Sequence, residues 1–258
     1  MAEKTLSSPR SRQWHKWIRR GFIAWGIFVF LYLFSGYRTV DVENHFLSSD
    51  KDISVTQAKG VLQLTPASYK KGLVFFCGSG VSSHAYLPLL RPIAQEGYGI
   101  FVIKLPYRFA PLESHKSQAV ECALRVLTEH QEVTSWVFSG HSLGGALACR
   151  VARDYPEAVS GLVLIGTTHP KRDDLSSVSF PVAKVYASHD GIAPVTKIKA
   201  NKYLLPEDAR YFRIEGGNHC QFGHYAGQFL DGKPEISRTD QQSQTRTVIL
   251  ETLASVSE

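Results

Sequence analysis

The chain has 258 residues, of which 43% are hydrophobic and 20% are charged, which is a globular composition of a length that suits one large domain or two small ones. The formal net charge is +6, but residues 1–38 alone hold seven basic side chains and one acidic one, which leaves 22 of each sign in the rest of the chain. A neutral body offers no electrostatic footprint for DNA or RNA, so no nucleic-acid partner is expected.

The N-terminal region combines this basic cluster with an apolar run. Residues 21–36 carry no charge and directly follow Arg19 and Arg20. As a helix, this run would rise about 24 Å, slightly less than the roughly 30 Å of bilayer hydrocarbon. We expect a basic cytoplasmic segment at residues 1–20 and an uncleaved, single-pass transmembrane anchor at residues 21–37, with the remaining domain outside the cytoplasm. A cleaved signal peptide, which would make the protein secreted, and a peripheral hairpin remain alternatives.

The rest of the chain predicts an α/β architecture. Residues 38–60 are polar and are expected to form a linker and the first edge strands, with weak strand character at 39–46. From Val61 onward, short apolar runs are typical of strands buried on both faces of a parallel sheet. These runs are Leu73–Cys77, Gly99–Leu105, Trp136–Ser139, Gly161–Ile165, Val182–Ala187 and Tyr211–Ile214.

Helix-length segments separate the predicted strands. They are Ala85–Glu96, Ser114–Gln131, Ser142–Tyr155, Pro194–Leu205 and Asp240–Val256. Strands that alternate with helices indicate βαβ units with right-handed crossovers. We therefore predict one domain over residues 61–258, with a doubly wound, mostly parallel sheet. Only sixteen residues separate Ile165 from Val182, so there is no room for a large lid.

A nucleophile motif lies between one predicted strand and the helix that follows it. Residues 140–144 read Gly-His-Ser-Leu-Gly, the G-x-S-x-G pattern in the strand–turn–helix context that it requires. Such a turn is sharp enough to lift the serine hydroxyl above the sheet edge, and the two glycines remove side chains that would collide across it. Ser142 is therefore the predicted nucleophile. The start of the helix at Leu143 would aim a backbone N–H at a developing oxyanion.

A serine at neutral pH needs a histidine base and a carboxylate that orients the base. In this fold the partners follow in the order serine, acid, histidine. Asp190 follows the strand Val182–Ala187 and is the predicted acid. The other candidates are Asp173 and Asp174, in a polar loop, and Glu215.

The histidine is expected in the loop after the last strand. His219 follows Tyr211–Ile214 in the segment Glu215-Gly216-Gly217-Asn218-His219 and is the predicted base. Four other histidines suit the role less well. His141 lies inside the motif and should point away from the nucleophile, His189 is next to the acid, His169 comes too early, and His224 belongs to a surface loop.

A second oxyanion donor is expected from the loop at residues 77–81, after the strand Leu73–Cys77. Its small residues let a backbone N–H approach the substrate closely, and the donor is Ser79 or Gly80. The four cysteines, Cys77, Cys122, Cys149 and Cys220, show no metal-ligand spacing and are interpreted as buried free thiols. No metal or cofactor is expected.

At these residues the sequence resembles the alpha/beta-hydrolase fold-5 family, over about residues 73–253. The likeness rests on Gly78-Ser79-Gly80-Val81 with Ala85-Tyr86, on the motif at 140–145, on Ser188-His189-Asp190-Gly191, and most specifically on residues 216–225, 231–232 and 236–238. The resemblance implies a small membrane-anchored or secreted hydrolase. Cys77, where related sequences often have proline, and residues 224–226 depart from the family pattern, which affects substrate preference rather than activity.

We therefore predict a serine hydrolase that cleaves a small ester or exposed acyl group through an acyl-enzyme. An acyltransferase or peptidase on the same triad is an alternative, and so is a non-catalytic, membrane-tethered binding module. The sequence leaves the natural substrate and the oligomeric state open.

Overall fold

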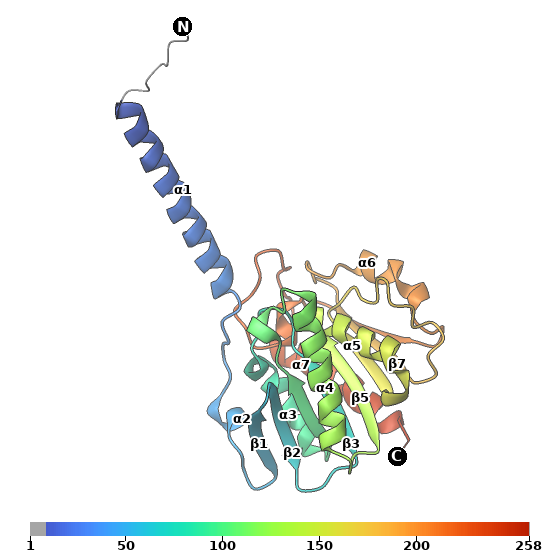
Figure 1. The fold of residues 1–258 in the computed structure, drawn as a ribbon. Coiled ribbons are helices and arrows are strands. Elements are labelled where there is room, and N and C mark those ends of the chain that lie inside the picture. The colour runs from blue at the N-terminus through green and yellow to red at the C-terminus, as the bar shows by residue number, and fades with distance from the viewer. Residues whose placement is uncertain (1–8, 258) are drawn as a thin grey trace.

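The computed structural model describes residues 9–257. The N-terminal helix α1 (Pro9–Ser35) projects away from the body of the molecule, and all other elements gather around one sheet (Figure 1). Most large apolar side chains of α1 are exposed, including Trp25 and Phe28.

The body is built on an eight-stranded sheet with the order β1-β2-β4-β3-β5-β6-β7-β8. The contacts of β2 with β1 and with β4 are antiparallel, and all other neighbouring strands are parallel. The strands are β1 (Ile53–Ala58), β2 (Val61–Pro66), β3 (Lys71–Phe76), β4 (Gly99–Ile103), β5 (Ser135–His141), β6 (Gly161–Ile165), β7 (Val182–Ala187) and β8 (Arg210–Ile214). Every residue of β4, β5, β6 and β7 is buried, which explains their nearly continuous apolar runs.

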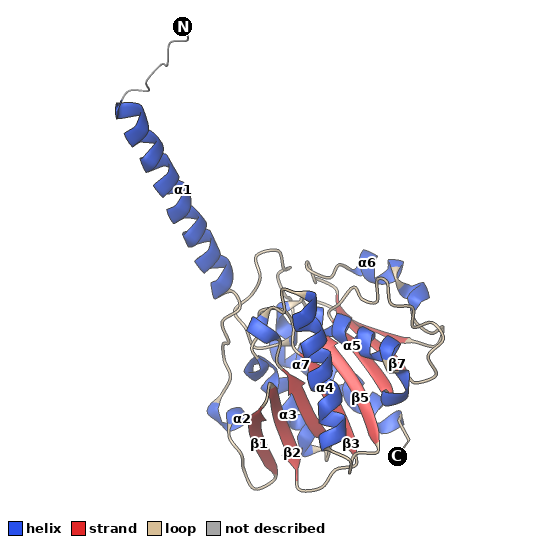
Figure 2. Cartoon of the chain, in the orientation of Figure 1, coloured by secondary structure: helices blue, strands red, loops and turns tan. Residues whose placement is uncertain are grey.

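Helices cover both faces of the sheet (Figure 2). On one face α3 packs against α7, and on the other α4 packs against α5. The helices of the body are α2 (Asn44–Leu47), α3 (Leu87–Gln95), α4 (Glu113–Glu129), α5 (Leu143–Asp154), α6 (Val195–Ala200) and α7 (Arg238–Ser255). The predicted α/β architecture with a mostly parallel sheet is confirmed.

Three local differences from the sequence-based expectation have physical causes. Residues 39–46, expected as a weak strand, contribute only an isolated bridge at Thr39 before the short helix α2. The helix expected at Pro194–Leu205 is α6 followed by a separate 3-10 turn, because Asn201 leaves the α-helical conformation. The strand β2 (Val61–Pro66) was not among the predicted strands, because polar Gln63 and Thr65 interrupt its apolar residues; it forms an antiparallel hairpin with β1, which lies within the expected edge-strand region.

The predicted transmembrane anchor at residues 21–37 is not supported. Among residues 9–257, no helix is long and apolar enough to cross a membrane. The first part of α1 carries Arg19 and Arg20, and its uncharged part would rise only about 22 Å as a helix, short of the roughly 30 Å of bilayer hydrocarbon.

The segment after α1 is paired with the body of the molecule. Val40 N–H donates to His224 O (3.0 Å), and Ala226 N–H donates to Arg38 O (2.9 Å). Tyr37 packs edge-on against Phe109, with ring centroids 5.5 Å apart. The predicted linker is therefore hydrogen-bonded to residues 224–226 and packed against Phe109, which follows β4.

The first test concerns which elements form the core. Leu164→Ala in β6 removes a fully buried side chain and should lower the free energy of unfolding by about 2–5 kcal/mol, because a cavity remains in the sheet. Leu31→Ala in α1 is the matched control: that side chain is 59% exposed, so a change below about 0.5 kcal/mol is expected. Urea unfolding of both variants measures the difference. Equal losses would show that α1 belongs to the core.

Candidate active site

Ser142 lies at the sharp turn between β5 and α5. Its backbone has φ 55° and ψ −116°, a conformation that non-glycine residues rarely adopt. The turn is this tight because a Cβ on Gly140 would lie 2.2 Å from the carbonyl carbon of Gly144, and a Cβ on Gly144 would lie 2.1 Å from Phe76 O. Only glycine fits at either position. The Ser142 side chain is consequently held, half-buried, at the carboxyl end of the central strand.

Asp190 and His219 are joined by a buried hydrogen bond. His219 Nδ1 lies 2.8 Å from Asp190 Oδ2, and both side chains are fully shielded from solvent. The other carboxylate oxygen of Asp190 accepts the N–H groups of Ile192 (2.9 Å) and Ala193 (2.6 Å). Because these three donors come from two separate loops, Asp190 both orients the imidazole and holds its own loop in place.

The opposite nitrogen of His219 is free. His219 Nε2 is buried and has no hydrogen-bond partner in the described chain, and no hydrogen bond joins it to Ser142. The His219 ring lies 4.4 Å, centroid to centroid, from the ring of His141, which is the residue before Ser142. The imidazole therefore lies beside the turn, with one nitrogen bound to a carboxylate and the other able to accept a proton.

The rival acids have other partners. Asp173 pairs with Arg153, Asp174 accepts hydrogen bonds from Ser176, and Glu215 pairs with Arg213 at 3.1 Å. Asp173 is less solvated than expected, since its side chain is only 13% exposed. None of these three carboxylates contacts His219.

The rival histidines also lie elsewhere. His189 Nδ1 lies 2.9 Å from Lys233 O, and His224 Nδ1 lies 2.9 Å from Asp41 O, so each ring is bound to a backbone carbonyl. His169 is largely buried, and burial lowers its pKa to about 4. It lines a pocket together with Leu143 and Arg150.

Most backbone N–H groups of the loop after β3 are already bonded. Gly78 N–H donates to the Tyr86 hydroxyl (2.9 Å), Gly80 N–H donates to Arg108 O (2.8 Å), and Val81 N–H donates to Gly78 O (3.1 Å). Ser79 N–H has no acceptor among the described residues. Leu143 N–H is the first of α5 and has no acceptor within the helix. Two N–H groups at the turn are thus free to bind a ligand oxygen.

Tyr86 connects this loop to the turn, a role that sequence reasoning missed. Its hydroxyl accepts the Gly78 N–H and forms a second hydrogen bond with His141 Nδ1, at 2.9 Å. Burial lowers the pKa of His141 well below its usual value, which leaves the ring neutral and able to accept. His141 is therefore buried against Tyr86 and His219. Only the tertiary contact reveals this, because nothing in the spacing of the two residues links them.

Asp231 holds the backbone around His219, and sequence reasoning assigned it no role beyond the family resemblance. Its carboxylate accepts the N–H groups of His219 (3.1 Å), Cys220 (2.8 Å), Gly232 (2.9 Å) and Gly191 (3.3 Å). Gly191 follows the acid Asp190, so one carboxylate connects the acid loop to the histidine loop.

Gln241, a buried residue of α7, holds the loop that carries His219 through hydrogen bonds to its backbone. Gln241 Oε1 accepts Asn218 N–H (3.0 Å), and Gln241 Nε2 donates to Asn218 O (2.7 Å). Asn218 is thus held through both its backbone groups, one residue before His219. Because α7 is anchored in the core, this contact ties the position of the imidazole to the packing of the sheet.

The remaining chemistry-bearing residues do not form a second centre. The four cysteines are buried, as predicted, and no two are joined. Burial raises the pKa of Cys77 and Cys149 to about 12, so these thiols stay protonated. Within residues 9–257, no group of three or more His, Cys, Asp or Glu side chains is arranged to hold a metal ion.

The role of Asp231 can be tested by Asp231→Asn. An amide nitrogen would face several N–H donors, so we expect unfolding to cost about 1–3 kcal/mol less than in the wild type. We also expect the downfield NMR resonance of the His219 Nδ1 proton to broaden, because the loop that carries the ring loses its anchor. Asp208→Asn is the control: Asp208 is exposed and makes no side-chain hydrogen bond in the described part of the chain. Identical behaviour of the two variants would contradict the role.

Relatives with solved structures share this architecture. A CIB-like hydrolase from Thermoplasma acidophilum superposes with a TM-score of 0.61 at 16% identity, covering 78% of this chain and all of that one. Est1E from Butyrivibrio proteoclasticus has a TM-score of 0.55 at 12% identity, covering 79% of this chain and all of its own. At these identities the likeness shows a shared fold.

Sequence matching extends the relationship. A proposed non-heme haloperoxidase of Mycobacterium phage D29 is 27% identical over 96 residues, which are 36% of this chain and 34% of that protein, so the match spans about a third of this relative. Residues 72–243 match the sequence model of the alpha/beta hydrolase family, and this range includes the turn at Ser142 and the pair Asp190–His219. The chain belongs to the alpha/beta hydrolase family.

Proposed function

We propose that this alpha/beta hydrolase is a serine esterase in which Ser142 is the nucleophile, His219 the general base and Asp190 the residue that orients the base. The observation that carries the proposal is the buried His219–Asp190 hydrogen bond, which leaves Nε2 of the same ring unbound beside the strained turn at Ser142. The resemblance of the fold to LipS and LipT, lipolytic enzymes described among lipase and esterase families, supports it.

In the proposed reaction, Ser142 Oγ attacks the carbonyl carbon of the ester as His219 Nε2 takes the hydroxyl proton. Asp190 keeps the other imidazole proton on Nδ1, so that Nε2 is the basic nitrogen, and its negative charge stabilises the imidazolium that forms. The imidazolium then gives its proton to the leaving alkoxide. Water then attacks the acyl-enzyme as His219 Nε2 takes a proton from it. The same nitrogen gives that proton to Ser142 Oγ, which restores the hydroxyl and releases the acid.

For the oxyanion we propose the backbone N–H groups of Leu143 and Ser79. Both are free of other acceptors, whereas the N–H of Gly80 is occupied by Arg108 O. The Ser79 donor is therefore preferred to Gly80. Two fixed donors would stabilise the charge of the tetrahedral intermediate more than solvent would, because they need no reorientation.

The proposed substrate class is a small ester. Residues 166–181, between β6 and β7, contain no helix or strand that could form a lid domain. A structure of Est1E from Butyrivibrio proteoclasticus contains ferulic acid; it superposes with a TM-score of 0.58 at 12% identity, covering 84% of this chain. That ligand shows what a fold of this kind accommodates in one relative, and it supports small acyl groups here.

Ser142→Ala tests the nucleophile. It should abolish covalent labelling by a fluorophosphonate and lower ester turnover by several orders of magnitude, because the serine and histidine act as a unit. Ser79→Ala is a matched control, since its backbone N–H is retained and labelling should persist. Labelling of the Ser142→Ala protein at wild-type rate would refute the assignment.

Asp190→Asn tests the acid. The amide can stabilise the wrong tautomer of His219, a change that costs about 10⁴ in turnover in a well-studied serine protease. We expect a loss of more than about a hundredfold in kcat, with Ser142 still labelled slowly. The control is Asp174→Asn, because Asp174 bonds only to Ser176 and should keep turnover within a few fold of wild type. An Asp190→Asn protein that melts early but turns over normally would make the residue structural.

A further inference from the structure

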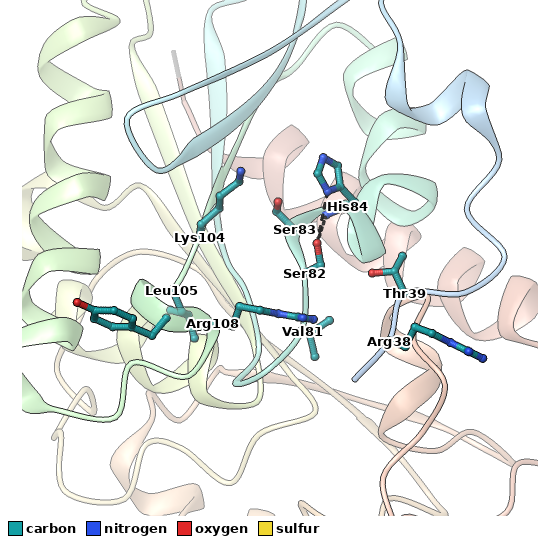
Figure 3. A pocket seen from close by; sticks show the side chains of 10 residues that line it. Arg38, Thr39, Val81, Ser82, Ser83, His84, Lys104, Leu105 and Arg108 are labelled. Carbon is teal, nitrogen blue, oxygen red and sulfur yellow. Dashed lines mark hydrogen bonds between the residues drawn. The ribbon is translucent and has the colours of Figure 1, made fainter. Parts of the chain in front are cut away.

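A pocket of about 490 Å³ lies directly beside the proposed oxyanion loop. Its inner wall is formed by Val81, Ser82 and Ser83, and Val81 follows Gly80 in the chain. Figure 3 shows Lys104 and Arg108 on one side of Ser82 and Ser83, and Arg38 with Thr39 on the other. The pocket is thus formed by the loop after β3, the loop after β4 and the segment after α1.

The charges around this pocket are all of one sign. Lys104, Arg108 and Arg38 line it, and no aspartate or glutamate does. In the part of the chain that the structure describes, none of the three forms an ion pair with a carboxylate, although the body as a whole has as many acidic as basic residues. His84 also lines the pocket, and its pKa is lowered by burial and by Lys104, so it adds no negative charge.

A second basic pocket, which Leu143 also lines, differs in its charges. Three of its five arginines and lysines pair with its two lining carboxylates, Glu113 and Asp173, and the other two form no ion pair with a described residue. The lining of the pocket beside the oxyanion loop has no carboxylate, so none of its three basic side chains is neutralised within the pocket. A bound anion would supply the missing counter-charge.

Arg108 is held with most of its donors unused. Its Nη2 donates to Tyr37 O (3.0 Å), and its guanidinium lies 5.8 Å from the ring centroid of Phe34. Its Nε is buried without any acceptor among the described residues, and no hydrogen bond of Nη1 is present there. The guanidinium therefore lines the pocket with donor capacity left for an anion.

The same residue is also mechanically linked to the site. Arg108 has φ 65°, a left-handed conformation that is unfavourable for a non-glycine side chain, and its carbonyl accepts the Gly80 N–H (2.8 Å). A ligand that binds the Arg108 side chain therefore contacts the residue that holds the loop carrying Ser79 N–H. Burial lowers the pKa of Lys104, and an anion next to it would favour its charged form.

From this geometry we propose that the pocket binds an anionic group of the ester substrate, a carboxylate or a phosphate, through Lys104, Arg108 and the hydroxyls of Ser82 and Ser83. The proposal rests on the proposed esterase function and narrows its substrate class to acidic esters. Arginine and lysine together suit either group, since a guanidinium matches both planar carboxylate and phosphate oxygens and an ammonium acts as a point charge.

The first test measures binding without catalysis. Thermal unfolding of the full chain is followed with inorganic phosphate and, separately, with glutarate, for the wild type and for Lys104→Met, Arg108→Met and Lys199→Met. Lys199 is an exposed lysine of α6 that forms no ion pair with a described residue, and it controls for loss of one positive charge. We expect at least one anion to stabilise the wild type and Lys199→Met, and the shift to be lost in Lys104→Met. Phosphate alone indicates a phosphate ester, and glutarate alone indicates a carboxylate.

The second test measures selectivity. The ratio of kcat/KM for an aryl hemisuccinate to that for the matching aryl butyrate compares a carboxylate with a methyl group at the same chain length. This ratio should fall about tenfold in Lys104→Met, the effect expected for one charge-assisted hydrogen bond, and should stay at the wild-type value in Lys199→Met. An ester that carries its carboxylate in the alcohol half is compared in the same way with its neutral analogue. A fall of the kcat/KM ratio in Lys104→Met with either acidic ester supports the proposed anion site.

The outcomes separate the two proposals. If neither anion stabilises the protein and neither ratio changes while Ser142-dependent ester hydrolysis persists, the pocket proposal is wrong and the esterase proposal stands. If anion binding depends on Lys104 but no ester is hydrolysed, the reverse holds. Should Arg108→Met fail to fold, Lys104→Met still decides the question, because Lys104 makes no side-chain hydrogen bond within the described chain.

Discussion

The hydrogen bond between His219 Nδ1 and Asp190 is the interaction on which the rest of the site depends. Both side chains are fully buried, so neither can exchange its partner for water, and separating them would leave one oxygen of a buried carboxylate without a donor. The two residues belong to loops after different strands. Their contact therefore requires that β7 and β8 lie side by side in parallel, with their carboxyl ends at the same edge.

Several groups that touch no substrate maintain this contact. Asp231 binds the backbone on both sides of it, and Gln241 holds Asn218 from within the core. On the opposite side of the turn, Tyr86 joins the loop at Gly78 to His141. A rigid framework of this kind reduces the reorganisation needed when charge develops, because the dipoles already point where they are required.

The backbone N–H groups and the side-chain charges lead to related conclusions. Of the N–H groups in the loop after β3, those of Gly78 and Gly80 are bonded within the protein, and this selects Ser79 as the proposed donor. Among the basic side chains, those near Glu113 are paired internally, whereas Lys104 and Arg108 are not. In both cases the groups free to bind a ligand are identified by finding which groups already have partners.

The sequence alone was sufficient for the fold class and for the family. Fully buried strands require continuous apolar runs, and for this reason the limits of β6 and β7 agree with the predicted ones to the residue. The glycines around Ser142 indicate the tight turn because no other residue avoids backbone collision there. The chain order of serine, acid and histidine also pointed to Asp190 and His219, whose catalytic roles remain predictions.

Only the tertiary structure decided what depends on contacts between distant segments. Tyr86, Asp231 and Gln241 reach Gly78, His141, His219 and Asn218 from 8 to 55 residues away, and no local pattern links them to the site. The transmembrane expectation found no support, because among residues 9–257 no helix is long and apolar enough to cross a membrane, and α1 includes Arg19 and Arg20. The body of the chain is neutral by net charge. A sum over the chain cannot show that Lys104 and Arg108 meet in a pocket whose lining has no carboxylate.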